Sequence, residues 1–393
     1  MSTVSIIIPT CNRSDYLLCA IREILSRVED VEIIVSDNSD TDAIRSLLAI
    51  EIERGLVQYA FIPERVSVVE NFERAVLRAT GEYVICIGDD DCVGAGFNEV
   101  VIWAKENNID AVFSYADRFI ANYFWPGIKS KYFGDGYQAK LFLKPYSWRK
   151  YKIKGTKALA EAAQNLGGGL GCMPRIYHGL VKRDVLEKIR RKYGSIFGGV
   201  SPDIYSSTLI SLESDLIFRI DGPFVLPGGS PKSTAGKGAA HTDRSNLYDV
   251  EHISRFGSSL VWTPVVPAYY GPHNVWAHSM ICALKTADIK NIKPNYMSLL
   301  LKAWIGDQSY SKEIFLAMKI AIRERGISSS FIDFIKACFN ESKNLVRRVI
   351  WKFLAGGQEI GQLMDIGAAL NYIEQSDKVR NLKIKDLLDH RLK

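Results

Sequence analysis

The chain has 393 residues, of which 47% are hydrophobic, 24% charged and 11% aromatic, and its formal net charge is +6 at pH 7. This composition excludes a disordered chain, and at roughly 100–200 residues per domain the length predicts two or three domains. No stretch approaches the roughly 18 uncharged apolar residues of a membrane-spanning helix. Because the N-terminus has neither a basic start nor a long apolar region, we expect no secretory signal and a cytoplasmic location.

The seven cysteines are scattered along the chain and include no Cys-x-x-Cys pair. This pattern argues against a disulfide framework and against a structural zinc site. Several cysteines lie in apolar runs, where a buried thiol is the expected state.

The positive charge is concentrated in two segments. Residues 288–393 contain 18 Lys and Arg against 12 Asp and Glu, and residues 118–154 contain nine basic residues against one acidic residue. Eleven aromatic residues are interleaved with the basic residues of 118–154. Such a segment is typical of a surface that meets anionic partners, stacks on sugars or bases, or lies at a lipid interface. For the C-terminal segment, solvated surface lysines are an equally simple explanation.

The first 115 residues alternate between strand and helix patterns. Apolar runs predict strands at 4–8, 31–35, 57–62, 83–87 and 110–114. Helical spacing predicts helices from residue 14 or 15 and at 41–50 and 68–79. The alternation predicts an α/β fold with a doubly wound, mostly parallel sheet, whose ligands bind beyond the carboxyl ends of the strands. We therefore expect the site among loops 9–14, 36–41, 63–67 and 88–92.

The pattern is less regular after residue 118. Helices are predicted at 156–165 and 181–193, and residues 227–245, which are rich in glycine and small polar residues, predict a flexible loop. From residue 274 onward the pattern is helical, with segments such as 296–304, 311–324, 329–339, 342–354 and 359–374.

Three consecutive carboxylates, Asp89, Asp90 and Asp91, directly follow the fourth predicted strand. Such residues repel one another, and the cluster becomes favourable when a divalent cation neutralises it. Oxygen ligands suit Mg²⁺ or Mn²⁺. A solvated acidic turn is the alternative, but the position at the end of a buried strand favours a metal site.

Polar residues also follow the first two strands. Pro9, Thr10 and Arg13 come after the first strand, and Asp37 and Asn38 come after the second. Each group alone is ordinary turn chemistry. Together with the acidic turn, they predict a pocket for a nucleotide diphosphate that has no glycine-rich phosphate loop.

Four segments resemble glycosyltransferase family 2, namely residues 6–13, 32–39, 69–74 and 81–91. The Gly-Asp-Asp-Asp sequence at 88–91, with Val-Ser-Asp-Asn and Glu-Asn-Phe, is most similar to the abequosyltransferase-like, O-antigen-type bacterial subgroup. The resemblance implies a GT-A fold, a nucleotide-sugar donor, a divalent metal and inversion at the anomeric carbon. It implies donor-binding roles for Pro9, Thr10, Arg13, Asp37, Asn38, Asn71 and Asp89, and metal-binding roles for Asp90 and Asp91. Gly88 departs from the commoner Asp-x-Asp-Asp form, so the order of roles among residues 89–91 stays open.

An inverting transfer needs one general base to take the proton of the acceptor hydroxyl. The resemblance implies an Asp or Glu in the second half of the domain, and the Ser-Pro-Asp segment at 201–203 gives Asp203 as the candidate. A helix-capping role for Asp203 is the alternative. Asp215 and Asp221 are poorer candidates, because they adjoin apolar, strand-like sequence.

The predicted flexible loop carries three further candidates. Some GT-A enzymes close such a loop over the donor and add a histidine to the metal, which makes His241 a candidate ligand. A solvated loop histidine is the alternative. Lys232 and Lys237 are candidates for contact with the diphosphate.

We therefore predict a glycosyltransferase, inverting and hexosyl- or deoxyhexosyl-type, that depends on Mn²⁺ or Mg²⁺. Its acceptor would be a glycan or lipid-linked glycan in bacterial surface polysaccharide synthesis, with peripheral contact to an anionic membrane and no nucleic-acid partner. Residues 1–115 would form the nucleotide-sugar-binding half, 116–245 the acceptor-side half and 246–393 a mainly helical domain. Two alternatives remain at this point: a sugar nucleotidyltransferase, although residues 9–14 contain no glycine, and a non-catalytic GT-A-like module that binds glycan or lipid.

Overall fold

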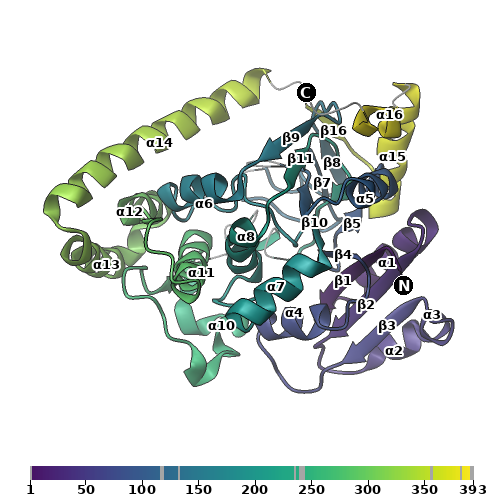
Figure 1. Cartoon of the computed structure of the whole chain (residues 1–393), viewed down its shortest axis with the longest axis horizontal. Helices are drawn as coiled ribbons and strands as arrows, with labels where there is room; N and C mark the ends of the chain where they lie inside the picture. The colour runs from purple at the N-terminus through teal and green to yellow at the C-terminus, as the bar shows by residue number, and fades with distance from the viewer. Residues whose placement is uncertain are drawn as a thin grey trace.

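The structure is a computed structural model, and it describes residues 2–115, 119–131, 133–233, 236–238, 244–354, 357–380 and 383–389 (Figure 1). His241 lies outside these residues. The strands are β1 (Val4–Thr10), β2 (Val31–Asp37), β3 (Val57–Phe61), β4 (Tyr83–Cys86), β5 (Cys92–Val93), β6 (Ala111–Phe113), β7 (Ala121–Phe124), β8 (Lys140–Leu143), β9 (Lys150–Ile153), β10 (Gly179–Lys182), β11 (Ile217–Ile220), β12 (Val225–Leu226), β13 (Gly228–Gly229), β14 (Ser245–Asn246), β15 (Tyr269–Tyr270) and β16 (Gln358–Ile360). The helices are α1 (Ser14–Arg27), α2 (Ala43–Leu47), α3 (Ala49–Glu53), α4 (Val68–Val76), α5 (Phe97–Glu106), α6 (Gly155–Gln164), α7 (Arg183–Tyr193), α8 (Pro202–Glu213), α10 (Glu251–Ser254), α11 (Pro272–Thr286), α12 (Tyr296–Gly306), α13 (Ser311–Arg325), α14 (Ile327–Leu354), α15 (Ile366–Val379) and α16 (Ile384–Asp389).

An eight-stranded sheet lies at the centre of the fold, in the order β3-β2-β1-β4-β10-β6-β11-β9. The pairs β1–β2, β1–β4, β2–β3 and β6–β11 are parallel. Strand β10 inserts antiparallel between β4 and β6, and β9 closes the edge antiparallel to β11. The structure thus confirms the predicted α/β fold with a mostly parallel sheet.

The apolar runs of the sequence become strands that are buried on both faces. In β1, Ile6 and Ile8 belong to a core shared with α1, α5 and α15, whereas Ile7 belongs to a second core shared with α4, α7 and α8. All three side chains are fully buried. Alternation along a strand explains this division, because successive side chains point to opposite faces.

The sequence pattern of residues 118–154 predicts that its aromatic residues lie on a docking surface. In the structure only some of them are exposed. Tyr123, Trp125, Tyr146 and Trp148 are buried in the core that contains β1. Phe133 is 60% exposed. The aromatic residues therefore serve in large part to pack β7, β8 and the following segment against the main sheet, and the interpretation as a docking surface is wrong for the four buried rings.

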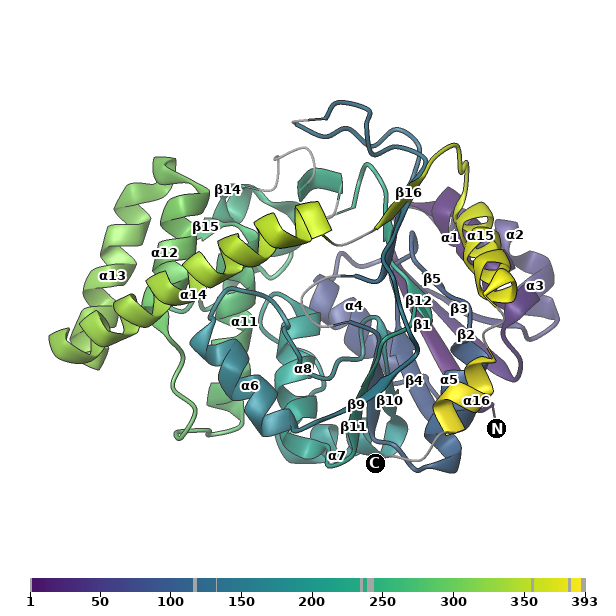
Figure 2. The ribbon, with the colours of Figure 1, turned by 90° about the horizontal axis from the view of Figure 1, so that it is seen from above.

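The C-terminal region divides into two parts. Helices α11–α14 gather on one side of the sheet, and the predicted helices 329–339 and 342–354 form one continuous helix, α14 (Figure 1). The chain then returns to the first part of the fold. Strand β16, where a helix was predicted, pairs with β8, and α15 and α16 pack near α1 and α5 (Figure 2). No helix among the described residues is both long and apolar enough to cross a membrane.

Helix α15 joins the first part of the fold through both apolar and polar contacts. Leu370 and Ile373 are fully buried in the main core. Arg27 of α1 donates to Glu374 at 2.5 Å and to Asn371 at 2.8 Å. The boundary predicted at residue 246 stays untested as a domain boundary, but residues 366–379 contribute directly to the core around β1.

We expect Leu370→Ala to destabilise the whole first part of the fold. Deletion of a fully buried leucine side chain costs roughly 2–5 kcal/mol, so the midpoint of thermal or urea unfolding should fall clearly. Val379, in the same helix, is 87% exposed, and Val379→Ala should change the free energy of unfolding by no more than about 0.5 kcal/mol. Equal midpoints for the two variants would contradict the integration of α15 into this core.

Candidate active site

Loops from four parallel strands meet at the carboxyl-end edge of the sheet. The Asn38 backbone N–H donates to the Thr10 carbonyl at 3.0 Å, and the Asn38 side-chain amide donates to the Ile62 carbonyl at 2.9 Å. The Thr10 hydroxyl donates to Asp89 at 2.7 Å. The structure therefore brings together the loops that follow β1, β2, β3 and β4, as the strand pattern predicted.

Asp89 is fully buried and bound from two sides. Arg13 forms an ion pair with Asp89 Oδ1 at 2.7 Å, and Thr10 occupies Oδ2. Burial raises the pKa of Asp89 to about 7, although the Arg13 guanidinium acts in the opposite direction. The carboxylate therefore needs Arg13, or another cation, to stay ionised at neutral pH.

Asp91 is also buried, and its two oxygens accept four hydrogen bonds. Oδ2 accepts from the Gly88 N–H at 2.6 Å, from Tyr177 at 3.0 Å and from His178 Nε2 at 2.6 Å, and Oδ1 accepts from the Gly228 N–H at 2.7 Å. Burial alone would raise the pKa of Asp91, but His178 and the backbone donors lower it below its ordinary value. These contacts give Asp91 a structural function. Its predicted metal-binding role stays untested.

Asp90 has fewer partners than its two neighbours. Its Oδ2 accepts from the Ser230 N–H at 2.8 Å, and its Oδ1 lies 3.6 Å from Arg13. Burial, together with the charge of Asp91, raises the pKa of Asp90. Of the three carboxylates, Asp90 has the oxygen that is least engaged.

The segment that reaches the acidic turn was predicted as part of a flexible loop, and this prediction is wrong for its first residues. Gly228 and Gly229 form strand β13, which pairs with β7. The N–H groups of Gly228 and Ser230 bind the carboxylates of Asp91 and Asp90. A Cβ atom at position 228 would lie 1.7 Å from the Asp90 carbonyl oxygen, so only glycine fits this approach. The exposed side chains of Lys232 and Lys237 lie further along the segment.

The remaining donor-site candidates are buried around the same edge. Asp37 accepts from the Ser39 N–H at 2.9 Å and from the Tyr59 hydroxyl at 2.7 Å. Pro9 lies in β1, opposite Ser36 of β2. Asn71 accepts from the Ser36 hydroxyl at 2.6 Å and thereby ties α4 to the end of β2. The donor-binding roles of these residues stay predictions.

Arg255 is a cation at this edge that the sequence did not indicate. It donates to the Asn38 side-chain oxygen at 2.7 Å and to Glu251 at 2.7 Å. It follows α10, more than two hundred residues from Asn38, and no motif surrounds it. A second cation therefore stands beside the loops that follow β1 and β2.

A row of polar side chains, in which His178 and Arg175 are buried and Tyr115 is half-buried, extends from the acidic turn. His178 Nε2 faces Asp91, and His178 Nδ1 lies 3.1 Å from the Tyr115 hydroxyl. The Arg175 guanidinium lies over the Tyr115 ring at 4.8 Å and over the Phe113 ring at 4.7 Å. Burial lowers the pKa of Arg175, which is only 1% exposed. His178, Tyr115 and Arg175 were missed from the sequence, because each stands outside any recognisable motif.

Asp203 lies at the far side of this row. It is partly exposed in the first turn of α8, and the negative charge of Asp203 contributes to the pKa values of both Tyr115 and Arg175. Its carboxylate accepts from the Ser201 hydroxyl and from the Ile204 N–H at 2.9 Å. These local contacts fit the capping alternative, while the partial exposure and the position next to this row fit the base. Its catalytic role stays untested.

The carboxylates can be tested for their fit to a divalent cation. Among the described residues, no group of three or more His, Cys, Asp or Glu side chains converges as a metal site would require. Mg²⁺ is nevertheless commonly held by one or two carboxylates together with substrate phosphates. Asp90 Oδ1 offers such a position, because its ion pair with Arg13, at 3.6 Å, is longer than a hydrogen bond. The described residues therefore fit a cation that shares its ligands with a diphosphate, and no set among them fits a cation held by protein side chains alone.

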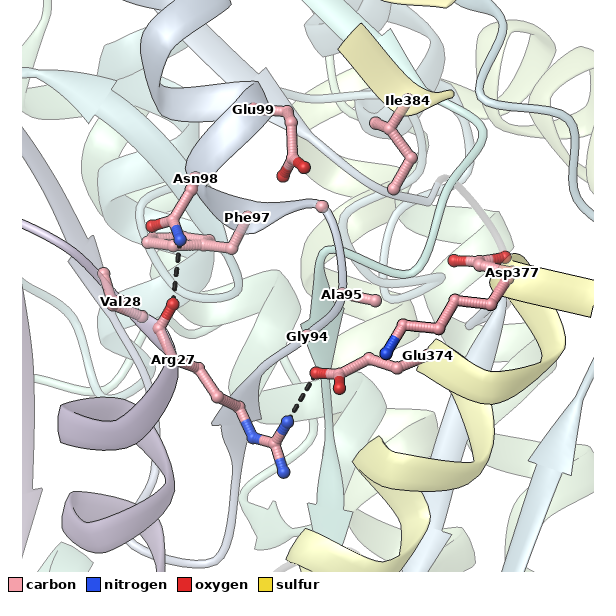
Figure 3. Close-up of a pocket in the computed structure, with 12 residues that line it drawn as sticks. Arg27, Val28, Gly94, Ala95, Phe97, Asn98, Glu99, Glu374, Asp377 and Ile384 are labelled. Atoms are coloured by element: carbon pink, nitrogen blue, oxygen red, sulfur yellow. Dashed lines mark hydrogen bonds and ion pairs between the residues drawn. The ribbon is translucent and has the colours of Figure 1, made fainter. Parts of the chain in front are cut away.

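A cavity of about 320 Å³ lies elsewhere, between α1, α5 and α15 (Figure 3). Its lining includes Arg27, Glu99, Glu374, Asp377 and Lys378. Charged side chains of both signs face it, and Arg27 pairs with Glu374 across it. Since no residue of the acidic turn lines this cavity, it is distinct from the candidate active site.

The first part of the chain is similar to a known family. Residues 5–168 match the model of glycosyl transferase family 2, a range that includes all four loops of the candidate site. This part of the chain is therefore similar to glycosyl transferase family 2 over residues 5–168. The match, together with the mixed, mostly parallel sheet, confirms the GT-A type fold with an added helical C-terminal region.

Individual proteins are only distantly similar. No curated protein matches the chain. Among solved structures, Staphylococcus aureus TarS 1–349 in complex with UDP-GlcNAc is 11% identical, with 98% of this chain and 90% of that chain covered at a TM-score of 0.44. The mannosyltransferase PcManGT from Pyrobaculum calidifontis in complex with GDP-Man and Mn²⁺ is 17% identical, with 86% of each chain covered at a TM-score of 0.38. The chain covers 61% of TarS 1–349 in complex with UDP, at 14% identity and a TM-score of 0.40, and 54% of a further TarS structure. These similarities assign no role to any residue.

The contacts predict opposite effects on stability for two neighbouring substitutions. The pKa of Asp90 is raised in the folded state, so its ionised form costs stability at pH 7, and Asp90→Asn should leave the melting temperature unchanged or raise it. The pKa of Asp91 is lowered, so its ionised form stabilises the fold above its unfolded pKa of about 4. An asparagine amide nitrogen cannot accept, so Asp91→Asn should leave buried donors unpaired and cost about 1–3 kcal/mol.

Melting curves of both variants and the unsubstituted chain between neutral and acidic pH provide the measurement. The difference in melting temperature between Asp91→Asn and the unsubstituted chain should become smaller as the pH falls through the lowered pKa of Asp91. At that pH the Asp91 carboxylate of the unsubstituted chain also loses its charge. Equal destabilisation by both substitutions at pH 7 would refute the distinction between these carboxylates.

Proposed function

We propose that the chain is a glycosyltransferase that moves a sugar from a nucleotide-diphosphate donor to a hydroxyl group of a glycan acceptor. One observation carries this proposal: the part of the chain that matches the family 2 model holds three buried carboxylates at the carboxyl-end edge of its sheet, and among them Asp90 has the least engaged oxygen. A turn built only for folding would not bury three adjacent charges, because each loses its hydration.

The donor would bind between the loops that follow β1, β2 and β4. Asp37, the last residue of β2, would contact the base, as the motif resemblance implies, and Asn38 would line the donor site next to it. Asp89, fixed by Thr10 and Arg13, would face the ribose. Arg13 and Arg255 supply positive charge on the same edge, which favours a diphosphate by charge complementarity.

Asp90 would hold a divalent cation, either Mn²⁺ or Mg²⁺, together with the diphosphate. Such a cation neutralises charge on a diphosphate leaving group. Arg13, 3.6 Å from Asp90, compensates the carboxylate in this structure and would turn toward the phosphates when a cation is bound. Asp91 would keep the turn in place through its four hydrogen bonds. His241 would add a ligand from the loop.

Asp203 would act as the general base. Its side chain is partly exposed, so a substrate hydroxyl has access to it, whereas the carboxylates of the acidic turn are buried. The Ser201 hydroxyl and the Ile204 N–H orient the carboxylate. Attack from the side opposite the leaving group would invert the anomeric carbon, with the hydroxyl proton transferred to an Asp203 oxygen.

The finer assignments rest on the sequence motifs. The Gly-Asp-Asp-Asp turn and its companion segments support a hexosyl- or deoxyhexosyl-transferase of the abequosyltransferase-like, O-antigen-type subgroup. This implies a bacterial surface polysaccharide as product and a carrier-lipid-linked glycan as acceptor, at the inner face of the cytoplasmic membrane.

Nucleotide binding tests the donor and cation assignments together. Melting temperatures should be measured with UDP, GDP, CDP and dTDP, each with and without Mn²⁺, and a screen for hydrolysis of nucleotide sugars then identifies the sugar. We expect one nucleotide to stabilise the chain, more strongly with Mn²⁺, and Asp90→Asn to remove the Mn²⁺-dependent part. If no nucleotide stabilises the chain with or without Mn²⁺, the donor site is refuted.

The general base has its own test. We expect Asp203→Asn to reduce kcat by about 10²–10⁴, the usual contribution of general-base catalysis, with the affinity for the nucleotide donor intact. Asp215→Asn, the same chemical change at an exposed position, serves as the control and should leave kcat unchanged. If Asp203→Asn instead lowers the melting temperature and spares kcat, Asp203 only caps α8.

A further inference from the structure

Helix α14 has its apolar side turned away from the protein. Its exposed apolar residues, each 44–79% exposed, are Ile327, Phe331, Ile332, Phe334, Ile335, Phe339, Leu345 and Val346. Positions four residues apart, such as 327, 331, 335 and 339, lie on one side of a helix. Figure 1 shows α14 along the outer edge of the helical region, and in Figure 2, seen from above, α14 crosses in front of the other helices of this region. This is the reverse of a surface helix that buries its apolar stripe.

The inner side of α14 is polar and is held by ion pairs. Glu341 pairs with Lys302 of α12 at 2.9 Å, and Lys302 is only 7% exposed. Asp333 pairs with Arg325 at the end of α13 at 3.6 Å, and the Asp333 carbonyl accepts from Asn295 at 3.0 Å. These contacts fix which side of the helix faces inward. The outward position of the phenylalanines is therefore a consequence of specific polar contacts.

The same contacts separate the charges of α14. The two acidic residues of the helix, Asp333 and Glu341, point inward and are neutralised there. Lys336 and Lys343 are exposed and form no ion pair with the described residues. The outer part of α14 thus combines an apolar face with uncompensated positive charge.

We propose that the outer face of α14 docks on an anionic lipid surface. The combination of an apolar face rich in phenylalanine with flanking basic residues is the pattern of a helix that lies in the plane of a membrane interface. Residues 327–346 extend over about 30 Å at 1.5 Å per residue, and their apolar side enters the boundary between headgroups and acyl chains. The exposed lysines contact anionic headgroups.

A second copy of the chain is the other occupant to consider, and the charges disfavour it. Two α14 helices packed face to face would bring together the exposed lysines of both copies, while both acidic residues are already used on the inner side. Like charges at an interface oppose association. An anionic bilayer supplies the missing negative charge as well as an apolar phase.

Co-sedimentation with vesicles tests the proposal on the full chain. The probes are vesicles of phosphatidylcholine alone and of phosphatidylcholine with phosphatidylglycerol, at low and high salt. We expect binding to the anionic vesicles only, weakened by salt because screening reduces the attraction. Lys336→Glu with Lys343→Glu should weaken binding by at least about tenfold, given the usual contribution of a lysine near an anionic leaflet.

The apolar face is tested by Phe331→Ser with Ile335→Ser. Both side chains are more than half exposed, so the variant should keep its melting temperature while vesicle binding falls by roughly tenfold or more. Leu47→Ser with Ile50→Ser removes two apolar side chains of similar exposure from α2 and α3, and should bind as the unsubstituted chain does.

Three outcomes would overturn the proposal: no binding to anionic vesicles at low salt, equal binding by the α14 variants, or self-association without vesicle binding that disappears in Phe331→Ser with Ile335→Ser. The last outcome, seen by analytical ultracentrifugation, would assign the face to a second copy. The proposal deepens the membrane location that the proposed function includes. Vesicle binding does not depend on the transferase reaction, so its failure removes α14 as the membrane contact and leaves the donor site and the general base intact, and the reverse also holds.

Discussion

The burial of three adjacent carboxylates is the constraint on which the rest of the candidate site depends. Asp89, Asp90 and Asp91 are each at most 4% exposed, so the energy of their hydration has to be replaced from within the protein. The replacement comes from an arginine, a histidine, a tyrosine, a threonine and three backbone N–H groups. These donors come from loops after β1 and β4 and from segments more than eighty residues away. The turn therefore determines how the two halves of the domain meet.

The hydrogen-bond donors are divided unequally among the three carboxylates, and their pKa values are therefore shifted in different directions. Asp91 takes four donors and is stabilised in its ionised form, whereas Asp89 and Asp90 have raised pKa values and share one guanidinium. A site in which every charge were fully compensated would have no affinity left for a cation. The incomplete compensation of Asp90 is thus a property that a binding site needs and that a structural turn would avoid.

The features that sequence reasoning predicted depend on neighbouring residues in the chain, and the features that it missed depend on contacts between residues far apart in the chain. The runs at β1 and β2 are apolar because both faces of each strand are covered, which a continuous apolar pattern reveals. The acidic turn was found because charge at the end of such a strand is unusual. His178 and Arg255 were missed, since each acts on a loop far away in the chain and stands in no motif. The glycine content of residues 227–245 predicts a flexible loop, but Gly228 instead permits the close approach of strand β13 to the Asp90 carbonyl.

The aromatic and basic segments show a second limit of sequence-based prediction. A sequence pattern indicates that a segment has an apolar and a polar side, but it does not indicate which side faces the protein. Residues 118–154 suggested a surface of rings and lysines, yet four of the rings are buried in the core. In α14 the opposite occurs, and the apolar side is the exposed one. The packing partners decide which side of each segment faces inward. Trp148 packs into the core beside the sheet, whereas in α14 the acidic side chains of Glu341 and Asp333 face inward because they pair with Lys302 and Arg325. The buried ion pairs on the inner side of α14 therefore determine that the apolar side of this helix faces outward, where its amphipathic sequence pattern alone would predict that the apolar side is buried.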